Sequence, residues 1–299
     1  YLKYEMDFMA HTETLATFLI IFDFYLITKY KFSSKKIYLF LFGIILGALT
    51  LQRAAFIYVL VFFLIIFSIN YIVRKKYLYL FLSFLLAFSI TLPYQNYIFN
   101  KTGKFLFFVN YSAESLYWMS SPFPNEYGDW NNYELDSNCQ FKSMFNNLEV
   151  KESECNNEFL KRNHSEFFEE IKGLNMIEKN DLLYSKAINN IKNYPMKYLR
   201  NVVSNISRLF YNIPSSYFYQ NERTTLRIIP NSIIFTLILF SAGFSILNIK
   251  KIPLEMIYCV SFIFIYLALS SLVSAYARFF IVIVPYLFIW FAYSLKHWK

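Results

Sequence analysis

The sequence predicts an all-α polytopic membrane protein of about seven transmembrane helices, with a mainly helical extracytoplasmic domain inserted after the fourth. Two observations predict this class. The 299-residue chain is 57% hydrophobic and only 16% charged, whereas soluble domains are about 25% charged and about 45–50% apolar. Its apolar residues also gather into runs that approach the length of about 20 residues that a helix needs to cross a bilayer.

The net charge of +9 does not indicate a nucleic-acid-binding protein. Residues 100–226 hold 14 basic and 15 acidic residues, and the remaining positions hold 15 basic and 5 acidic ones. Most of this excess lies in short runs between apolar segments, an arrangement that orients a protein in a bilayer and does not build a basic face for a nucleic acid. The composition therefore predicts membrane lipids as partners and no nucleic acid.

The N-terminal membrane part, residues 1–99, is expected to contain about four spans. The first is expected at 14–27, the second and third in the long apolar block 37–73, and the fourth at 77–97. The block 37–73 is too long for a single span and is interrupted at Gln52 and Arg53, so we expect it to fold as a hairpin that turns near Arg53.

The C-terminal membrane part, residues 227–299, is expected to contain about three more spans, at 228–247, 253–272 and 279–295. Basic clusters fix the orientation, because cytoplasmic loops carry an excess of Lys and Arg. All of these clusters alternate correctly with seven spans if they are cytoplasmic, and they lie at 29–36, 74–76, 250–251 and 296–299. Residues 100–226 are then extracytoplasmic.

The inserted domain, residues 100–226, is expected to be mainly helical. Ser165 is expected to cap a short helix that runs to Ile171, and Asp181 to cap a second one. A third is expected beyond the break at Pro195, where apolar residues recur at helical spacing: Tyr198, Leu199, Val202, Val203, Ile206, Leu209 and Phe210. This apolar face packs on the insert, lies on the bilayer surface, or contacts a substrate directly.

The stretch from Gly103 to Trp130 opens the insert and is dense in aromatic residues. Acidic and turn-forming residues interrupt it, so it is too polar for hydrocarbon and too aromatic for a solvated linker. Such a mixture is typical of a folded layer at the membrane–water boundary. Tyr117 and Trp118 lie in the middle of this stretch.

Chemical motifs are sparse. The chain has no glycine-rich phosphate loop and no GxSxG elbow, and its three His residues are far apart, so the sequence predicts no metal site. Cys139 and Cys155 share the insert, and the sequence leaves open whether they form a disulfide bond.

Ionisable residues at membrane depth are more informative, because each is costly without a partner or water. Arg53 follows the 15 apolar residues 37–51, about 22 Å of helix, which is shorter than the ~30 Å hydrocarbon core. Arg278 has a similar setting. Both guanidinium groups either bind a phosphate or reach up to lipid headgroups. Asp23 is expected to pair with Lys29, and Glu13 is an interfacial charge or part of an outer cavity.

Several segments resemble the multi-pass C-type glycosyltransferases related to protein O-mannosyltransferases and the lipid A aminoarabinose transferase. Arg53 stands at the family's Arg, with Ala54 in place of its usual Pro, while Arg278 and Pro285 are kept. The four main segments, in chain order, are HTETLATFL at 11–19, GIILGALTLQRAA at 43–55, the aromatic stretch at 102–130 and YARFFIVIVPYL at 276–287. Residues 181–210 match more loosely.

The resemblance implies transfer of a sugar from a polyprenyl-phosphate-linked donor to a glycan, lipid or protein acceptor, at the inner membrane of a bacterium. Arg53 and Arg278 would hold the lipid phosphate, Tyr117 and Trp118 would lie near the sugar or acceptor, and Glu13 would line the site. No resident cofactor is implied, and a divalent cation is an option.

The family's catalytic carboxylate precedes the segment that matches 11–19, so the catalytic base is expected upstream of Tyr1 and these 299 residues alone are expected to be inactive. Two other classes are alternatives to a transferase: a transporter or flippase of lipid-linked glycans, and a glycan polymerase or ligase, which is also built with one large outer loop.

Overall fold

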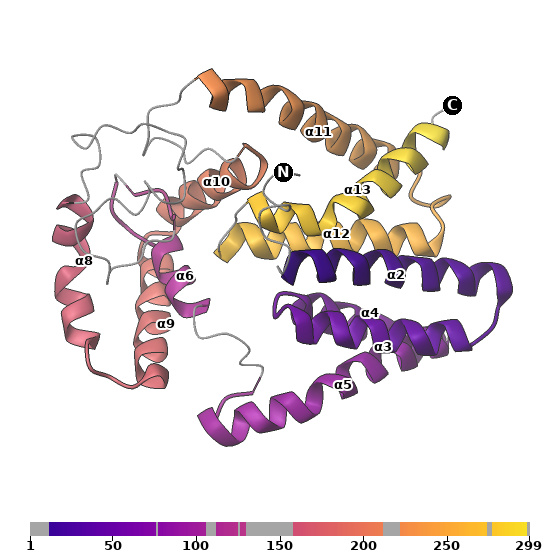
Figure 1. The fold of residues 1–299 in the computed structure, drawn as a ribbon, viewed down its shortest axis with the longest axis horizontal. Helices are drawn as coiled ribbons and strands as arrows, with labels where there is room; N and C mark the ends of the chain where they lie inside the picture. The colour runs from indigo at the N-terminus through magenta and orange to yellow at the C-terminus, as the bar shows by residue number, and fades with distance from the viewer. Residues whose placement is uncertain are drawn as a thin grey trace. The chain divides into compact units, whose positions relative to one another are not determined.

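The computed structural model describes residues 12–75, 77–105, 112–124, 126–129, 158–211, 222–273 and 277–297. Within these ranges the chain forms eleven helices and no strand (Figure 1), so the all-α prediction is confirmed for them. The described residues fall into two compact units. The first unit takes its residues from 1–109, 234–270 and 278–299, and the second takes them from 110–233 and 271–277.

Seven helices lie wholly or mainly in the first unit: α2 (Thr12–Ser33), α3 (Ile37–Gln52), α4 (Phe56–Arg74), α5 (Leu78–Thr102), α11 (Glu222–Leu247), α12 (Leu254–Val273) and α13 (Ala277–His297). The expected break of the long apolar block is confirmed, because α3 ends at Gln52 and Arg53 adopts an extended backbone before α4.

Five of the described helices are long and apolar enough to cross a membrane: α4, α5, α11, α12 and α13. Helix α3 is apolar but only 16 residues long. Helix α2 has 22 residues, and it carries Glu13, Asp23, Lys29 and Lys31. Five long apolar helices are typical of a multi-pass integral membrane protein.

Two glycines let α3 and α5 approach each other closely. A Cβ atom built on Gly43 would lie 2.6 Å from the carbonyl oxygen of Ser83, and one built on Gly47 would lie 3.0 Å from that of Ala87. Glycines four residues apart line one face of a helix and allow two backbones to come into contact, as in tightly packed membrane helices. The α3–α5 contact therefore depends on the absence of these side chains.

We expect Gly43→Ala to lower the free energy of unfolding of the first unit by about 1–3 kcal/mol, because the new methyl group meets backbone that cannot rotate away. Gly243→Ala in α11 is the matched control, since a Cβ there meets no atom within 4 Å and alanine favours helix. Thermal unfolding in detergent micelles measures both. Equal midpoints for the two variants would show that α3 and α5 do not pack this closely.

The predicted pair of Asp23 with Lys29 is wrong. Asp23 is fully buried, and its Oδ2 accepts a hydrogen bond from the hydroxyl of Tyr258 on α12 at 2.6 Å and one from Tyr286 on α13 at 3.4 Å. Lys29 instead places its ammonium 5.5 Å from the centre of the Tyr25 ring. A buried carboxylate needs close donors, and two tyrosines on other helices supply them.

Contacts at one end of the first unit join helix termini that are distant in sequence. Lys31, near the end of α2, forms an ion pair with Glu255 at the start of α12. Lys36, just before α3, lies with its ammonium 4.3 Å from the centre of the Tyr79 ring at the start of α5. These four termini thus share one end of the bundle.

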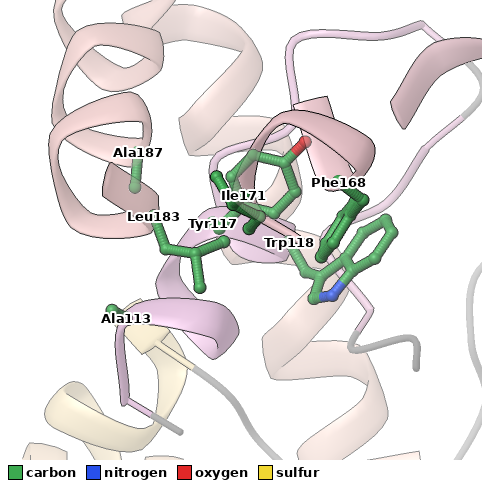
Figure 2. Packing of buried hydrophobic residues seen from close by; sticks show 7 residues of the cluster. All are labelled: Ala113, Tyr117, Trp118, Phe168, Ile171, Leu183 and Ala187. Atoms are coloured by element: carbon green, nitrogen blue, oxygen red, sulfur yellow. The ribbon is translucent and has the colours of Figure 1, made fainter. Parts of the chain in front are cut away.

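The second unit contains α6 (Ser112–Met119), α8 (Glu158–Ile171), α9 (Met176–Asn193) and α10 (Pro195–Tyr211). Its core is a cluster of buried residues from the first three of these helices (Figure 2): Ala113, Tyr117, Trp118, Phe168, Ile171, Leu183 and Ala187. Rings of Trp118 and Phe168 stack with their centres 5.6 Å apart, so aromatic packing joins α6 to α8.

The predicted helix starts in this unit are only partly right. The expected break is present, but α10 begins at Pro195 itself and not beyond it, because proline suits the first turn of a helix. The cap predicted at Asp181 is wrong, since Asn175 accepts hydrogen bonds from the amides of Ile177 and Glu178 and α9 begins there. Ser165 lies inside α8 and does not begin it.

Candidate functional site

The structure brings Glu13 and Arg53 together at the turn between α3 and α4. The Nη1 atom of Arg53 lies 3.1 Å from Oε1 of Glu13, and the two side chains are 12% and 7% exposed. The guanidinium carbon lies 5.1 Å from the centre of the Phe279 ring on α13. Three segments far apart in sequence therefore meet around one shielded cation.

The Glu13–Arg53 contact is an ion pair without an aligned hydrogen bond. Although the two atoms are close, Nη1 is buried and has no hydrogen-bond partner among the described residues. The carboxylate neutralises the guanidinium, which keeps an N–H group for a further acceptor. An anion that binds here must therefore share Arg53 with Glu13 or displace that carboxylate.

Arg278, the second predicted phosphate ligand, precedes Phe279 near the start of α13. Its side chain lies outside the described residues. Because Phe279 contacts the Arg53 guanidinium, the backbone of α13 begins close to the Glu13–Arg53 pair. A role for Arg278 beside Arg53 stays a prediction.

Tyr117 and Trp118 lie in the core of the second unit, only 3% and 2% exposed (Figure 2). Tyr117 stacks on Phe167 with ring centres 5.1 Å apart. Both rings face other side chains of the unit, so contact with a sugar would require this core to open. Their role near the sugar or acceptor stays a prediction.

A hydrogen-bonded chain runs from Tyr117 through His164 to Glu126, and all three side chains are buried. The Tyr117 hydroxyl lies 2.6 Å from Nδ1 of His164. Nε2 of His164 lies 2.9 and 3.0 Å from the two carboxylate oxygens of Glu126. Ser121 and Asn163 also donate to this carboxylate, the latter at 2.8 Å.

A neutral imidazole satisfies this chain completely. Nε2–H donates to Glu126 and Nδ1 accepts from the phenol of Tyr117, so each polar atom has the partner it needs. Burial, and secondarily the negative charge of Glu126, raise the pKa of the Tyr117 phenol, which stays protonated and remains a donor. Chains of this kind can relay a proton, but burial of every member favours a structural role here.

The segment 119–129, which contacts His164 of α8 through Glu126, also accepts hydrogen bonds from polar side chains of α10. Asn201 donates to the carbonyl oxygens of Met119 and Ser121 at 3.0 and 3.1 Å. Arg208 donates to those of Tyr127 and Gly128, both at 2.9 Å. Gly128 has φ of +70°, and a Cβ there would lie 2.9 Å from that of Asn201, so glycine permits this close approach.

Lys197 completes the attachment of α10 to this segment. Its ammonium donates to the backbone carbonyl oxygen of Glu126, and to Oδ1 of Asn201 at 2.8 Å. Burial lowers the pKa of Lys197, an effect that nearby Glu126 opposes and Arg200 reinforces. The result is a loop held on both sides by side chains rather than by regular backbone pairing.

Sequence reasoning did not find this network. Glu126 and His164 are 38 residues apart, and neither lies in a recognisable motif. The only local signal is that the aromatic stretch contains an acidic residue next to turn-forming prolines, which we interpreted as membrane-surface character. The predicted site at Arg53, by contrast, came from helix length and membrane depth, and the predicted place of Glu13 in it came from the family resemblance.

Cys139 and Cys155 lie outside the described residues. Among the residues that the structure does describe, no group of three His, Cys, Asp or Glu side chains is placed to hold a metal ion.

These helices define the class of the chain: an all-helical protein, over its described parts, with the apolar helices of a multi-pass integral membrane protein. Comparisons with protein family models, with characterised protein sequences and with solved structures find no match to the chain.

Proposed function

We propose that the chain is a glycosyltransferase that moves a sugar from a polyprenyl-phosphate-linked donor to a glycan, lipid or protein acceptor on the outer face of the membrane. The observation that carries the proposal is the convergence of Glu13, Arg53 and Phe279. Each belongs to a different one of the four segments that resemble the C-type glycosyltransferases.

The proposal includes a topology of seven spans in a bacterial inner membrane, with α2 and α3 added to the five long apolar helices and residues 100–226 outside the cytoplasm. Contacts at both ends of the first unit support it. Lys31 and Glu255 join helix ends that the basic clusters predict to be cytoplasmic. Glu13 and Arg53 join ends predicted to be outside.

Arg53 would act by binding the phosphate of the lipid donor. A guanidinium presents several N–H groups in a plane and can hold phosphate oxygens in a bidentate manner. Phe279 packs against one part of the group, and Glu13 keeps the charge neutral until the phosphate arrives. Arg278, adjacent to Phe279 in sequence, would supply the second cation.

Binding of polyprenyl phosphate to the protein in lipid nanodiscs tests this role, with the uncharged polyprenol as the control ligand. We expect Arg53→Lys and Arg278→Ala to weaken binding of the phosphate about 10- to 150-fold, the loss of a charged hydrogen bond worth about 1.5–3 kcal/mol. Lys35→Ala, at an exposed position near the opposite end of α2 and α3, should leave affinity unchanged.

The variant Glu13→Gln provides a second test, because it removes the carboxylate that competes with the phosphate for Arg53 and keeps the cation. We expect this variant to bind polyprenyl phosphate more tightly than the parent. If Glu13→Gln and Arg53→Lys both bind as the parent does, Arg53 serves only to neutralise Glu13 and the phosphate site is refuted.

Activity separates the transferase from its alternatives. A labelled polyprenyl-phosphate sugar, supplied with an extract of cell-envelope acceptors, should give labelled acceptor when the protein is present and none when it is absent. Movement of the intact lipid-linked sugar between bilayer leaflets without transfer would instead identify a flippase.

A further inference from the structure

We propose that the outward face of α10, formed by Met196, Leu199, Val203 and Ile206 and called here the α10 stripe, docks on the surface of a lipid bilayer. The inference does not depend on the proposed transfer reaction. It rests on the arrangement of polar and apolar residues around α10 and on the bonds that connect α10 to the end of a long apolar helix.

Helix α10 is amphipathic with its polar side inward. Asn201, Asn205 and Arg208 are buried and donate hydrogen bonds to backbone carbonyl oxygens of the second unit. In a helix that covers a protein core, apolar residues occupy this inward position and polar ones face water. Leu209 is also buried, but the other three buried residues of α10 are polar and are held inward by hydrogen bonds.

The α10 stripe is correspondingly exposed. Met196, Leu199 and Val203 are 68%, 52% and 66% exposed, and Ile206 continues the same side of the helix at 37%. Their spacing of three and four residues places them in a row. Because the inward bonds fix the rotation of the helix, the stripe faces away from the core and is available to an apolar partner.

The bonds of α10 to the end of α12 favour lipid as that partner, because they place α10 beside a helix that can span a membrane. Asn205 donates to the carbonyl oxygen of Ser271 at 2.8 Å, and the Tyr198 hydroxyl donates to that of Leu272 at 2.7 Å. Both acceptors lie in the last turn of α12, within the second unit. Since α12 is apolar enough to span a membrane, its last turn belongs at the membrane–water boundary, and α10 is bonded to it.

The charges around the stripe also fit a bilayer surface. Helix α10 contains no Asp or Glu, and of its cations Lys197 and Arg208 bond inward, so that Arg200 is the one beside the stripe. Arg200 is exposed and adjoins the stripe, and Lys192 and Tyr194 are exposed just before the helix. Cations that flank an apolar helix face attract anionic headgroups, and tyrosine favours the interface, as in helices that lie in the membrane plane.

A fluorescent probe on the stripe tests the proposal in the full chain. After Cys139, Cys155 and Cys259 are replaced by serine, Val203→Cys is labelled with an environment-sensitive dye and the protein is placed in nanodiscs that contain anionic lipid. The control is Glu169→Cys on α8, whose native side chain is 59% exposed and does not belong to the stripe.

We expect the dye at 203 to shift its emission to the blue and to lose most of it when quencher-bearing lipids are included, while the dye at 169 stays water-like. Leu199→Ser, at an exposed position that folding should tolerate, should reduce quenching at 203. A water-like signal at 203 would overturn the proposal. So would a blue-shifted signal that lipid-borne quenchers cannot reach, since it would mean that protein, from this chain or a second copy, covers the stripe.

Discussion

Arg208→Ala should destabilise the second unit by about 3–5 kcal/mol, the cost of breaking a buried, hydrogen-bonded charge site. The guanidinium donates at 2.9 Å to the carbonyl oxygens of both Tyr127 and Gly128, and at 3.0 Å to Oδ1 of Asn205. It also lies 3.7 Å from a carboxylate oxygen of Asp129. Alanine removes the buried donor that these acceptors share, and in a buried site this costs more than the bonds alone.

Hydrogen exchange measures this effect locally. Amides of the segment 119–129 should exchange at least about a hundredfold faster in Arg208→Ala than in the parent, because 1.4 kcal/mol corresponds to a factor of ten. Arg200→Ala is the matched control, an exposed arginine on the same helix. If both variants exchange at the same rate, Arg208 does not hold this segment.

Arg53→Met should destabilise the first unit by a similar amount, about 3–5 kcal/mol, because it leaves the carboxylate of Glu13 buried without its cation. Methionine keeps apolar contact with the Phe279 ring, so the loss of stability measures the effect of the missing charge and not of lost packing. Thermal unfolding in nanodiscs, followed by circular dichroism, measures the effect.

Comparing the double variant Glu13→Gln/Arg53→Met with Arg53→Met measures the contribution of the unpaired charge to the loss of stability. Removing both members of a buried pair avoids an isolated charge and is often close to neutral. We therefore expect the double variant to be more stable than Arg53→Met by at least about 2 kcal/mol, a coupling typical of residues in contact. A double variant that unfolds no later than Arg53→Met would show that the two side chains do not interact in the membrane.

The positions of the apolar helices could be predicted from the sequence. The spans expected at 77–97, 253–272 and 279–295 correspond to α5, α12 and α13. These helices depend on local properties, namely runs of apolar residues and the basic residues that flank them. The helix caps of the second unit could not be predicted in the same way. Asn175 and Asp181 are equally good capping residues, and only the path of the folded chain decides which one begins α9.

The partners of the buried polar residues could not be predicted from the sequence. Lys29 is near Asp23 in sequence, yet Tyr258 and Tyr286 bind that carboxylate. Arg53 was expected to be recessed, but its pairing with Glu13 joins residues 40 positions apart. Such pairs depend on which helices pack together, and no periodicity within one helix records that choice.

The sequence by itself determined that this chain is built from helices and that several of them are apolar enough to cross a membrane, because helix length and hydropathy are properties of contiguous residues. Tertiary structure alone decided which side of α10 faces inward. The spacing of polar and apolar residues along α10 predicts two opposite sides, but it does not say which of them faces the core. Asn201 and Arg208 are buried because the carbonyl oxygens of the segment 119–129 need donors, and this demand outweighs the apolar burial that the sequence of α10 would otherwise favour.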